Sequence, residues 1–284
     1  MKNKWVQVGV LAVLGIVILV VGVLMGGGVK DFASAFETAD PGSSYQSIDE
    51  VDMSLVTDLE INIFRGGVSI SQENQEIYDY AGSNANVCYV KDGTKLVVGY
   101  GADFKKVLNN DVKDLEFTSE QFAQVVGSGT VYLKIPNDTH FNSVTINSKY
   151  SSIDIDKIDT DKLTINNTKG EVNIGKAQIS SQAIVENNGG NVNIGGNEEE
   201  INVIYGLNAK ATGGMINVSA QLMGTCEIES MKGVGLILNG AKANYTIDTS
   251  VKYAESNESG DGSTDSKGII KIRSKDDKVS ISYK

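Results

Sequence analysis

The sequence is poor in the residues that most catalytic centres require. Its 284 residues include a single histidine (His140), two cysteines and two arginines (Arg65 and Arg273). This set excludes zinc clusters, arginine clamps and any cysteine–histidine pair that does not use His140. Only 2 prolines and 7% aromatic residues are present, beside 31 glycines and 40% hydrophobic residues, which is apolar enough for a folded chain. We therefore expect no catalytic residue, cofactor or metal ion, and predict that the protein is not an enzyme.

Positive charge is also scarce. There are 25 basic residues against 36 acidic ones, and the formal net charge is −11. Such a surface repels nucleic acid and anionic membrane faces. We expect no nucleic-acid partner.

One long hydrophobic run stands near the N-terminus. Residues 5–25 contain Gln7 as the only clearly polar side chain, and as a helix they would span about 31 Å, which matches a bilayer core. The basic residues Lys2 and Lys4, in a short N-terminal segment (1–4), favour an N-inside orientation. The alternative is a cleaved signal, because residues 33–35 (ASA) fit a cleavage site, but the run is longer than such signals. We predict a single-pass membrane protein with its domain outside the cytoplasm and the lipid bilayer as a partner.

The rest of the chain divides into a linker and one long domain. Residues 26–47 are rich in glycine and polar residues and have no sustained period, as in a linker. Residues 48–284 form the predicted β-strand-repeat domain, with an insertion at 103–129, either a short helix or a long loop. A flexible loop is expected at 252–267, followed by closing strands at 269–272 and 279–282.

A repeat of about 20 residues dominates this domain. Its copies, each a turn followed by alternating inward residues, are SSIDI (151–155), GEVNI (170–174), GNVNI (190–194), GMINV (214–218) and the less regular GLILN (235–239). Each of the first four has an upstream partner, VTI (144–146), LTI (163–165), AIV (183–185) and LNA (207–209). Earlier, Leu59, Ile61 and Ile63 alternate in the same way, as do Val68 and Ile70.

Short strands that recur at this spacing predict a solenoid, because one unit cannot close a core alone and stacked units can. The predicted fold is an all-β, single-stranded parallel β-solenoid (β-helix-like), preceded by one transmembrane helix. Columns of Ile and Val should meet about 4.7 Å apart along the stack. At the turns, Gly170, Gly190 and Gly214 suit a positive φ. Cys88 and Cys226 should not pair, because several coils separate them.

Together these features resemble a known family. The segments that carry the resemblance are the basic N-terminus, the hydrophobic run, the Gly-rich linker, residues 60–70 (EINIFRGGVSI) and residues 133–136 (LKIP), which open the repeats. They are similar to the bacterial putative-adhesin family, a domain of unknown function in Gram-positive membrane proteins. The resemblance covers about residue 55 to the C-terminus, and it implies a β-solenoid at the cell envelope.

The densest cluster of side chains that could be catalytic consists of four carboxylates, Asp154, Asp156, Asp159 and Asp161. If Ile153 and Ile155 point inward, the first two share the outer face about 6.6 Å apart, a separation seen in inverting glycosidases. No aromatic platform or arginine stands nearby to hold a sugar, so polar outward positions of a soluble strand explain them better. Calcium is not favoured either, because Ile158 occupies the third ligand position of an EF-hand pattern and no glycine follows.

The other motifs in the sequence give weaker evidence of a function. His140 lies in a polar turn and is expected to be simply exposed. Residues 233–238 (GVGLIL) lack the third glycine of a dinucleotide fingerprint and sit in a strand repeat. The glycosylation-like tripeptides at Asn137, Asn166, Asn217, Asn244 and Asn257 are what Asn-rich strands produce by chance.

These features favour a non-enzymatic envelope protein, either adhesin-like or sensing the state of the envelope, that uses a flat solenoid face. The partner would be an envelope glycan or another envelope protein. The alternatives are a polysaccharide-active β-helix enzyme and a self-assembling envelope scaffold. The sequence does not indicate the oligomeric state.

Overall fold

The computed structural model describes residues 55–73, 87–100, 129–196, 201–249, 253–255, 268–276 and 278–284. The expected membrane segment (5–25), the linker (26–47) and nearly all of the insertion (103–129) lie outside these residues. Gly129, the last residue assigned to the insertion, already begins strand β4. None of the helices in the described parts has the length and apolarity that crossing a bilayer needs.

Within the described residues the fold is almost entirely β-structure, with one short 3-10 helix, η3 (Lys242–Asn244). The strands are β1 (Asp58–Glu73), β2 (Val87–Asp92), β3 (Lys95–Tyr100), β4 (Gly129–Pro136), β5 (Phe141–Lys169), β6 (Val172–Asn187), β7 (Val192–Ile194), β8 (Val203–Tyr205), β9 (Leu207–Ala211), β10 (Ile216–Ser230), β11 (Val234–Leu238), β12 (Tyr245–Thr249), β13 (Tyr253–Glu255), β14 (Gly268–Ser274) and β15 (Val279–Tyr283).

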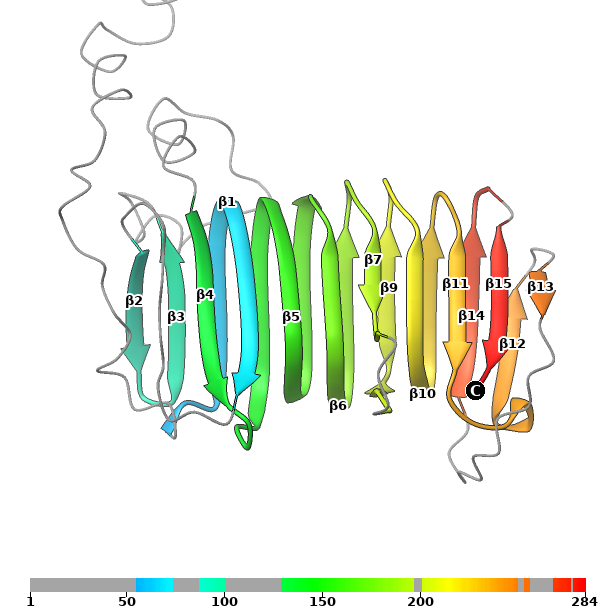
Figure 1. The fold of residues 1–284 in the computed structure, drawn as a ribbon, viewed down its shortest axis with the longest axis horizontal. Coiled ribbons are helices and arrows are strands. Elements are labelled where there is room, and N and C mark those ends of the chain that lie inside the picture. The colour runs from blue at the N-terminus through cyan, green and yellow to red at the C-terminus, as the bar shows by residue number, and fades with distance from the viewer. Residues whose placement is uncertain are drawn as a thin grey trace, which may run out of the picture.

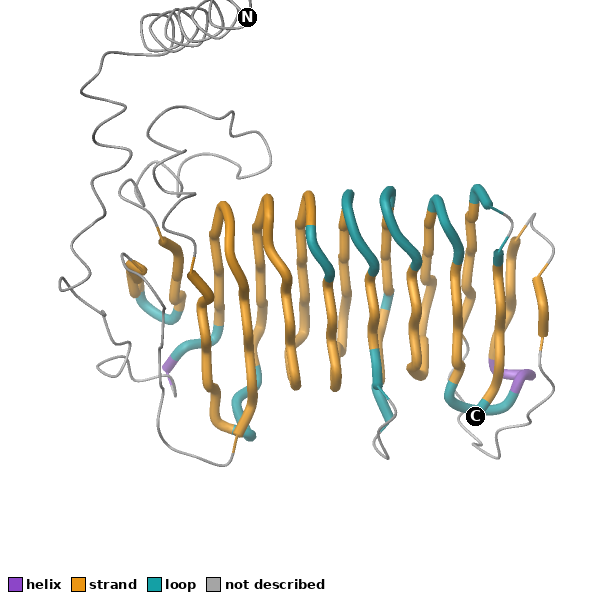
Figure 2. Tube along the Cα trace, turned by 45° about the horizontal axis from the view of Figure 1, so that its top comes forward, coloured by secondary structure: helices purple, strands orange, loops and turns teal. Residues whose placement is uncertain are grey.

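These strands stack into a solenoid in one 15-stranded sheet that winds around the molecule (Figures 1 and 2). Neighbouring coils pair in parallel, and the only antiparallel pair among the described strands is β2 with β3. Ile153 aligns with Val172, Val172 with Val192, and Val192 with Ile216, so the predicted first four copies are in the predicted register. The predicted all-β parallel solenoid is confirmed.

Each complete coil contributes one strand segment to each of two faces, and a third, shorter segment leads from face B back to face A. The third segments are residues 157–160 of β5, residues 176–179 of β6, β8 and residues 221–223 of β10. Face A contains the first half of β1, residues 143–148 and 163–167 of β5, residues 183–187 of β6, β9, residues 226–230 of β10, β14 and β12. Face B contains β4, the second half of β1, residues 153–155 of β5, residues 172–174 of β6, β7, residues 216–220 of β10, β11, β15 and β13.

The core lies between the faces as columns of branched aliphatic side chains. Buried residues along face B include Val68, Ile153, Val172, Val192, Ile216, Val234 and Val279. Face A supplies Ile61, Ile146, Ile165, Val185, Ala209, Ile228 and Ile272. Because inward and outward positions alternate along each strand, the residues between them face solvent.

The two ends of the stack do not follow chain order. At the N-terminal end, β1 lies between β4 and β5, although β4 follows β1 and precedes β5 in sequence. At the other end, β14 lies between β10 and β12, and β15 lies between β11 and β13. Residues 269–272 and 279–282 form strands, β14 and β15, as predicted, but they do not end the stack, because β12 and β13 lie beyond them. The prediction of a flexible loop over 252–267 is wrong at residues 253–255, which form β13.

The structure corrects the register of the fifth copy. Ile216 aligns with Val234 and Val218 with Leu236, so this copy begins three residues earlier than the alignment on Gly235 placed it. Ile237, which that alignment would turn inward, is 42% exposed.

The glycine prediction holds at one turn of the three. Gly170 has a φ of 115°, but Gly190 and Gly214 are not among the positive-φ glycines of the described residues. Close packing requires them instead. A Cβ on Gly190 would lie 2.0 Å from the Gly170 carbonyl oxygen, and one on Gly214 would lie 2.2 Å from that of Gly190.

Cys226 is a free, buried thiol, as the coil spacing predicted. Burial raises the pKa of this thiol, which keeps it protonated and unreactive.

Candidate functional site

The outer surface of face B carries a ladder of amides. Asn217 donates from Nδ2 to Asn193 Oδ1 at 2.9 Å, and Asn193 donates to Asn173 Oδ1 at 2.8 Å. Asn173 in turn donates to Asp154 Oδ1 at 2.8 Å. The offsets of 19, 20 and 24 residues are those of the coil repeat, so the stack places these side chains one above another. All the donors point toward one carboxylate.

Face A carries a second ladder with the same polarity. Asn166 donates to Asn147 Oδ1 and Asn147 to Asn62 Oδ1, both at 2.9 Å, and Asn62 donates to Glu60 Oε1 at 2.7 Å. Glu60 also pairs with Lys95 at 2.6 Å. Burial by itself would raise the pKa of Glu60, but the hydrogen bonds from Asn62 and Lys95 and the charge of Lys95 together lower it. The ladder therefore ends on a stable carboxylate.

Further along face A the outward residues are charged and alternate in sign. In register, Glu186 stands beside Lys210, Lys210 beside Glu229, and Glu229 beside Arg273. Lys210 pairs with Glu229 at 3.4 Å. In the neighbouring row Lys271 pairs with Glu227 at 3.1 Å.

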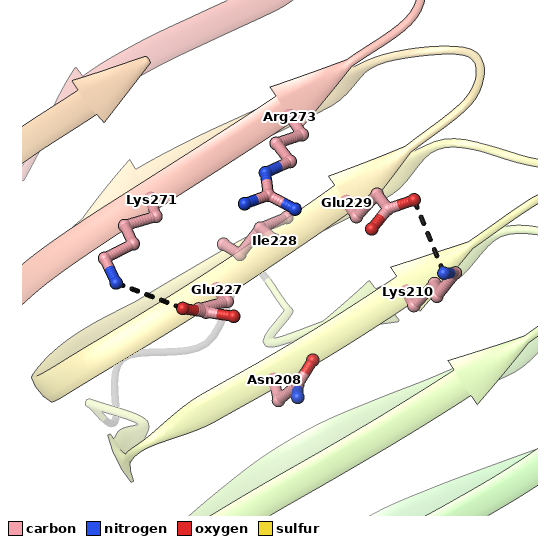
Figure 3. A pocket seen from close by; sticks show the side chains of 7 residues that line it. All are labelled: Asn208, Lys210, Glu227, Ile228, Glu229, Lys271 and Arg273. Carbon is pink, nitrogen blue, oxygen red and sulfur yellow. Dashed lines mark hydrogen bonds and ion pairs between the residues drawn. The ribbon is translucent and has the colours of Figure 1, made fainter.

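These charged residues surround a hollow, which Figure 3 shows across β9, β10 and β14. Its lining residues are Asn208, Lys210, Glu227, Ile228, Glu229, Lys271 and Arg273. The cavity volume is about 50 Å³, whereas small-molecule sites usually hold about 300–1,000 Å³. The hollow is therefore too small to enclose a substrate, and its cations and anions mostly bind one another.

The four predicted carboxylates do not form one site. Ile153 and Ile155 are buried, and Asp154 and Asp156 point outward on β5, as predicted. Asp159 and Asp161 instead face a different group, His140. Asp154 is the acceptor at the end of the face B ladder.

His140 is exposed, as predicted, but it also has two partners that the sequence did not indicate. Its Nδ1 lies 2.7 Å from Asp159 Oδ1, and its Nε2 lies 3.3 Å from Asp161 Oδ1. The hydrogen bond to Asp159 and the charges of both aspartates raise the pKa of His140. Ser180 donates to Asp161, and this bond with the nearby His140 lowers the pKa of Asp161. The side chain of His140 is 47% exposed. The cluster links the turn before β5 to the next coil, and because it is open to solvent its contribution to the stability of the fold is small.

The remaining motifs fall on structural positions. Residues 233–238 lie mainly in strand β11 and precede no phosphate-binding helix. Asn166 and Asn217 are members of the ladders, Asn137 Oδ1 accepts a bond from Lys157 at 3.2 Å, and Asn244 ends η3. Asn257 lies outside the described residues. In the described part of the chain, no three His, Cys, Asp or Glu side chains gather in a way that could hold a metal ion.

Sequence reasoning predicted a flat solenoid face, but it missed that the amides on the outer faces bond to one another. The signal was present, because Asn recurs at outward positions 173, 193 and 217 with the spacing of the core residues. It also missed the partner of His140, since Asp159 lies one coil, 19 residues, further along.

Comparison with known proteins places these features in context. The family model described as Toastrack DUF4097, a domain of unknown function, matches residues 106–284. Among solved structures, the chain is similar to a putative cell adhesion protein from Clostridium sporogenes, with 11% identity and a TM-score of 0.31. That match covers 82% of this chain and 96% of the other. A comparison with curated proteins gave no match.

Proposed function

We propose that this chain, which belongs to the Toastrack DUF4097 family, is a membrane-anchored, non-enzymatic envelope protein that binds a neutral glycan along face B. In this proposal residues 5–25 hold the protein in the cell membrane, with the N-terminus inside and the solenoid outside. The observation that carries it is the face B ladder of Asn173, Asn193 and Asn217.

The chemistry of the ladder suits hydroxyl groups. An amide has two N–H donors and an oxygen with two lone pairs, and each bond within the ladder uses one of each. The second N–H and the second lone pair remain available to a ligand. The rungs repeat about every 4.7–4.9 Å along the stack. A sugar hydroxyl both donates and accepts, so a neutral polysaccharide laid along the ladder could bond several rungs at once.

Face A is less suited to such a ligand. Half of its outward row is charged, and Lys210 and Lys271 already pair with Glu229 and Glu227. Replacing those pairs by hydroxyl contacts would leave charges less well solvated. Face A also has three bonded amides, but Asn62 is only 3% exposed and is not open to a ligand. On face B three successive rungs are neutral and none is buried. This difference between the faces supplies a matched control.

The test is retention of the detergent-solubilised full chain on insoluble neutral polysaccharides, chitin and cellulose. We expect wild-type protein to be retained on at least one of them. Replacing Asn173, Asn193 and Asn217 together by Ala should weaken retention at least about tenfold, because three hydrogen bonds of about 0.5–1.5 kcal/mol each exceed the 1.4 kcal/mol of a tenfold change.

The control is the face A variant with Asn147, Asn166 and Asn208 replaced by Ala, which should bind like wild type. Equal loss in both variants, or no retention of wild type on either polymer, would contradict the proposal. Release of soluble sugar by wild type, abolished when Asp154 and Asp156 are both replaced by Asn, would favour the polysaccharide-active enzyme instead.

A further inference from the structure

An inner row of small and amide side chains marks the corner where each coil turns from face A to face B. Asn167 aligns with Asn187, Asn187 with Ala211, and Ala211 with Ser230, and Ser230 aligns with Ser274. Ser148 holds the same position at the end of the preceding face A segment. We call this row, with Ser151 across the turn, the polar corner.

Three members of the polar corner make an equivalent hydrogen bond, from the side chain to a backbone carbonyl at the start of the same coil. Asn167 Nδ2 donates to the carbonyl of Ser151, and Asn187 Nδ2 donates to the carbonyl of Gly170, each at 2.9 Å. Ser230 Oγ donates to the carbonyl of Gly214, also at 2.9 Å. In each case a side chain at the end of face A satisfies a carbonyl at the start of the turn into face B.

Ala211 breaks this series. The carbonyl that corresponds to those of Gly170 and Gly214 is that of Gly190, and it receives no bond from any side chain of the described residues. Alanine has no donor to offer, and it is smaller than the asparagine of the two preceding coils. The coil of Ala211 therefore has one carbonyl without its usual partner, beside a position where an amide group is missing.

Unpartnered oxygens lie along the polar corner in the coils that lead up to this position. Ser148 Oγ, Ser151 Oγ, Asn167 Oδ1 and Asn187 Oδ1 have no hydrogen-bond partner among the described residues. All four side chains belong to the polar corner, and none is more than 3% exposed. A buried polar atom without a partner is costly, and native proteins normally satisfy such atoms with internal water.

We propose that a file of ordered water molecules occupies the polar corner, and that its last member stands beside Ala211 in place of the missing amide. This water donates one hydrogen to the Gly190 carbonyl and the other to Asn187 Oδ1. Both are acceptors, which a water molecule can satisfy together. The corner contains no carboxylate, so a divalent cation has no charged ligand there.

A crystal structure of the full chain that resolves ordered solvent tests the site directly. We expect density for water within about 2.7–3.2 Å of both the Gly190 oxygen and Asn187 Oδ1. A dry corner would overturn the proposal, and so would a metal ion with an anomalous signal at this position.

A pair of substitutions at Ala211 gives an independent readout. Ala211→Asn places the amide of the preceding coils where the water stands, so its thermal midpoint should equal that of wild type or exceed it by about 2–4 °C. Ala211→Leu has nearly the same shape without the polar group, and it should lower the midpoint because it displaces the water and leaves the carbonyl unpaired. Equal lowering by both variants would mean that the corner has no room for water, which contradicts the proposal.

Discussion

Replacing Ile174 by Asp is expected to lower the free energy of unfolding by about 4 kcal/mol or more. Ile174 is 2% exposed and stands in the core column between Ile155 and Ile194. A carboxylate there would have hydrocarbon on every side and no cation to pair with, and such burial is among the most destabilising changes known. Chemical denaturation of the full chain would measure the loss as a lower midpoint.

Gln182→Asp is the matched control for this substitution. Gln182 lies on the same strand, β6, but is exposed, and in register it stands beside Lys162. An added carboxylate there stays in water near a cation, so the free energy of unfolding should change by no more than about 0.5 kcal/mol. Similar midpoints for the two variants would show that the inward and outward positions of β6 have been assigned wrongly.

The second large effect is expected at the turn glycines. Gly190→Ala should cost about 3 kcal/mol or more, because the new Cβ would lie 2.0 Å from the oxygen and 2.7 Å from the carbon of the Gly170 carbonyl. Both atoms are backbone, so no side chain can rotate away and the coils themselves must separate. Thermal or chemical unfolding of the variant measures this cost.

Gly93→Ala separates close packing from backbone strain. Gly93 has a φ of 60°, but a Cβ there would meet nothing within 4 Å. Only the left-handed conformation would be penalised, by about 1–2 kcal/mol. If Gly190→Ala proved as mild as Gly93→Ala, the coils would not be stacked as closely at this turn as the structure has them.

The regular part of the solenoid could be predicted from sequence because its cause is local and periodic. Alternation along residues 153–155 and 172–174 indicates which side chains turn inward, and the turn that begins each of the first four copies indicates their register. The fifth copy was misaligned because it has no glycine at the position that Gly214 holds in the fourth. The pairing of Ile216 with Val234 puts Lys232 there, and Gly233 and Gly235 stand one and three residues after it.

The ends of the stack could not be predicted in this way. Periodicity identifies a segment as a strand, but it does not say which strand it pairs with. Nothing in residues 268–274 indicates that β14 inserts between β10 and β12, since that order depends on long-range packing. The roles of Gly190 and Gly214 have the same origin, because their requirement for glycine comes from the neighbouring coil and not from their own dihedral angles.

The proposed function depends most on the solenoid lying outside the cell, tethered by residues 5–25. Protease treatment of intact cells that express the full chain with a tag after Lys284 tests this most directly; Lys284 is exposed, so a tag there is open to digestion. We predict that the tag is lost from intact cells while a cytoplasmic marker protein survives. A tag that resists protease in intact cells and is digested only after lysis would contradict the outward orientation, and with it the envelope role.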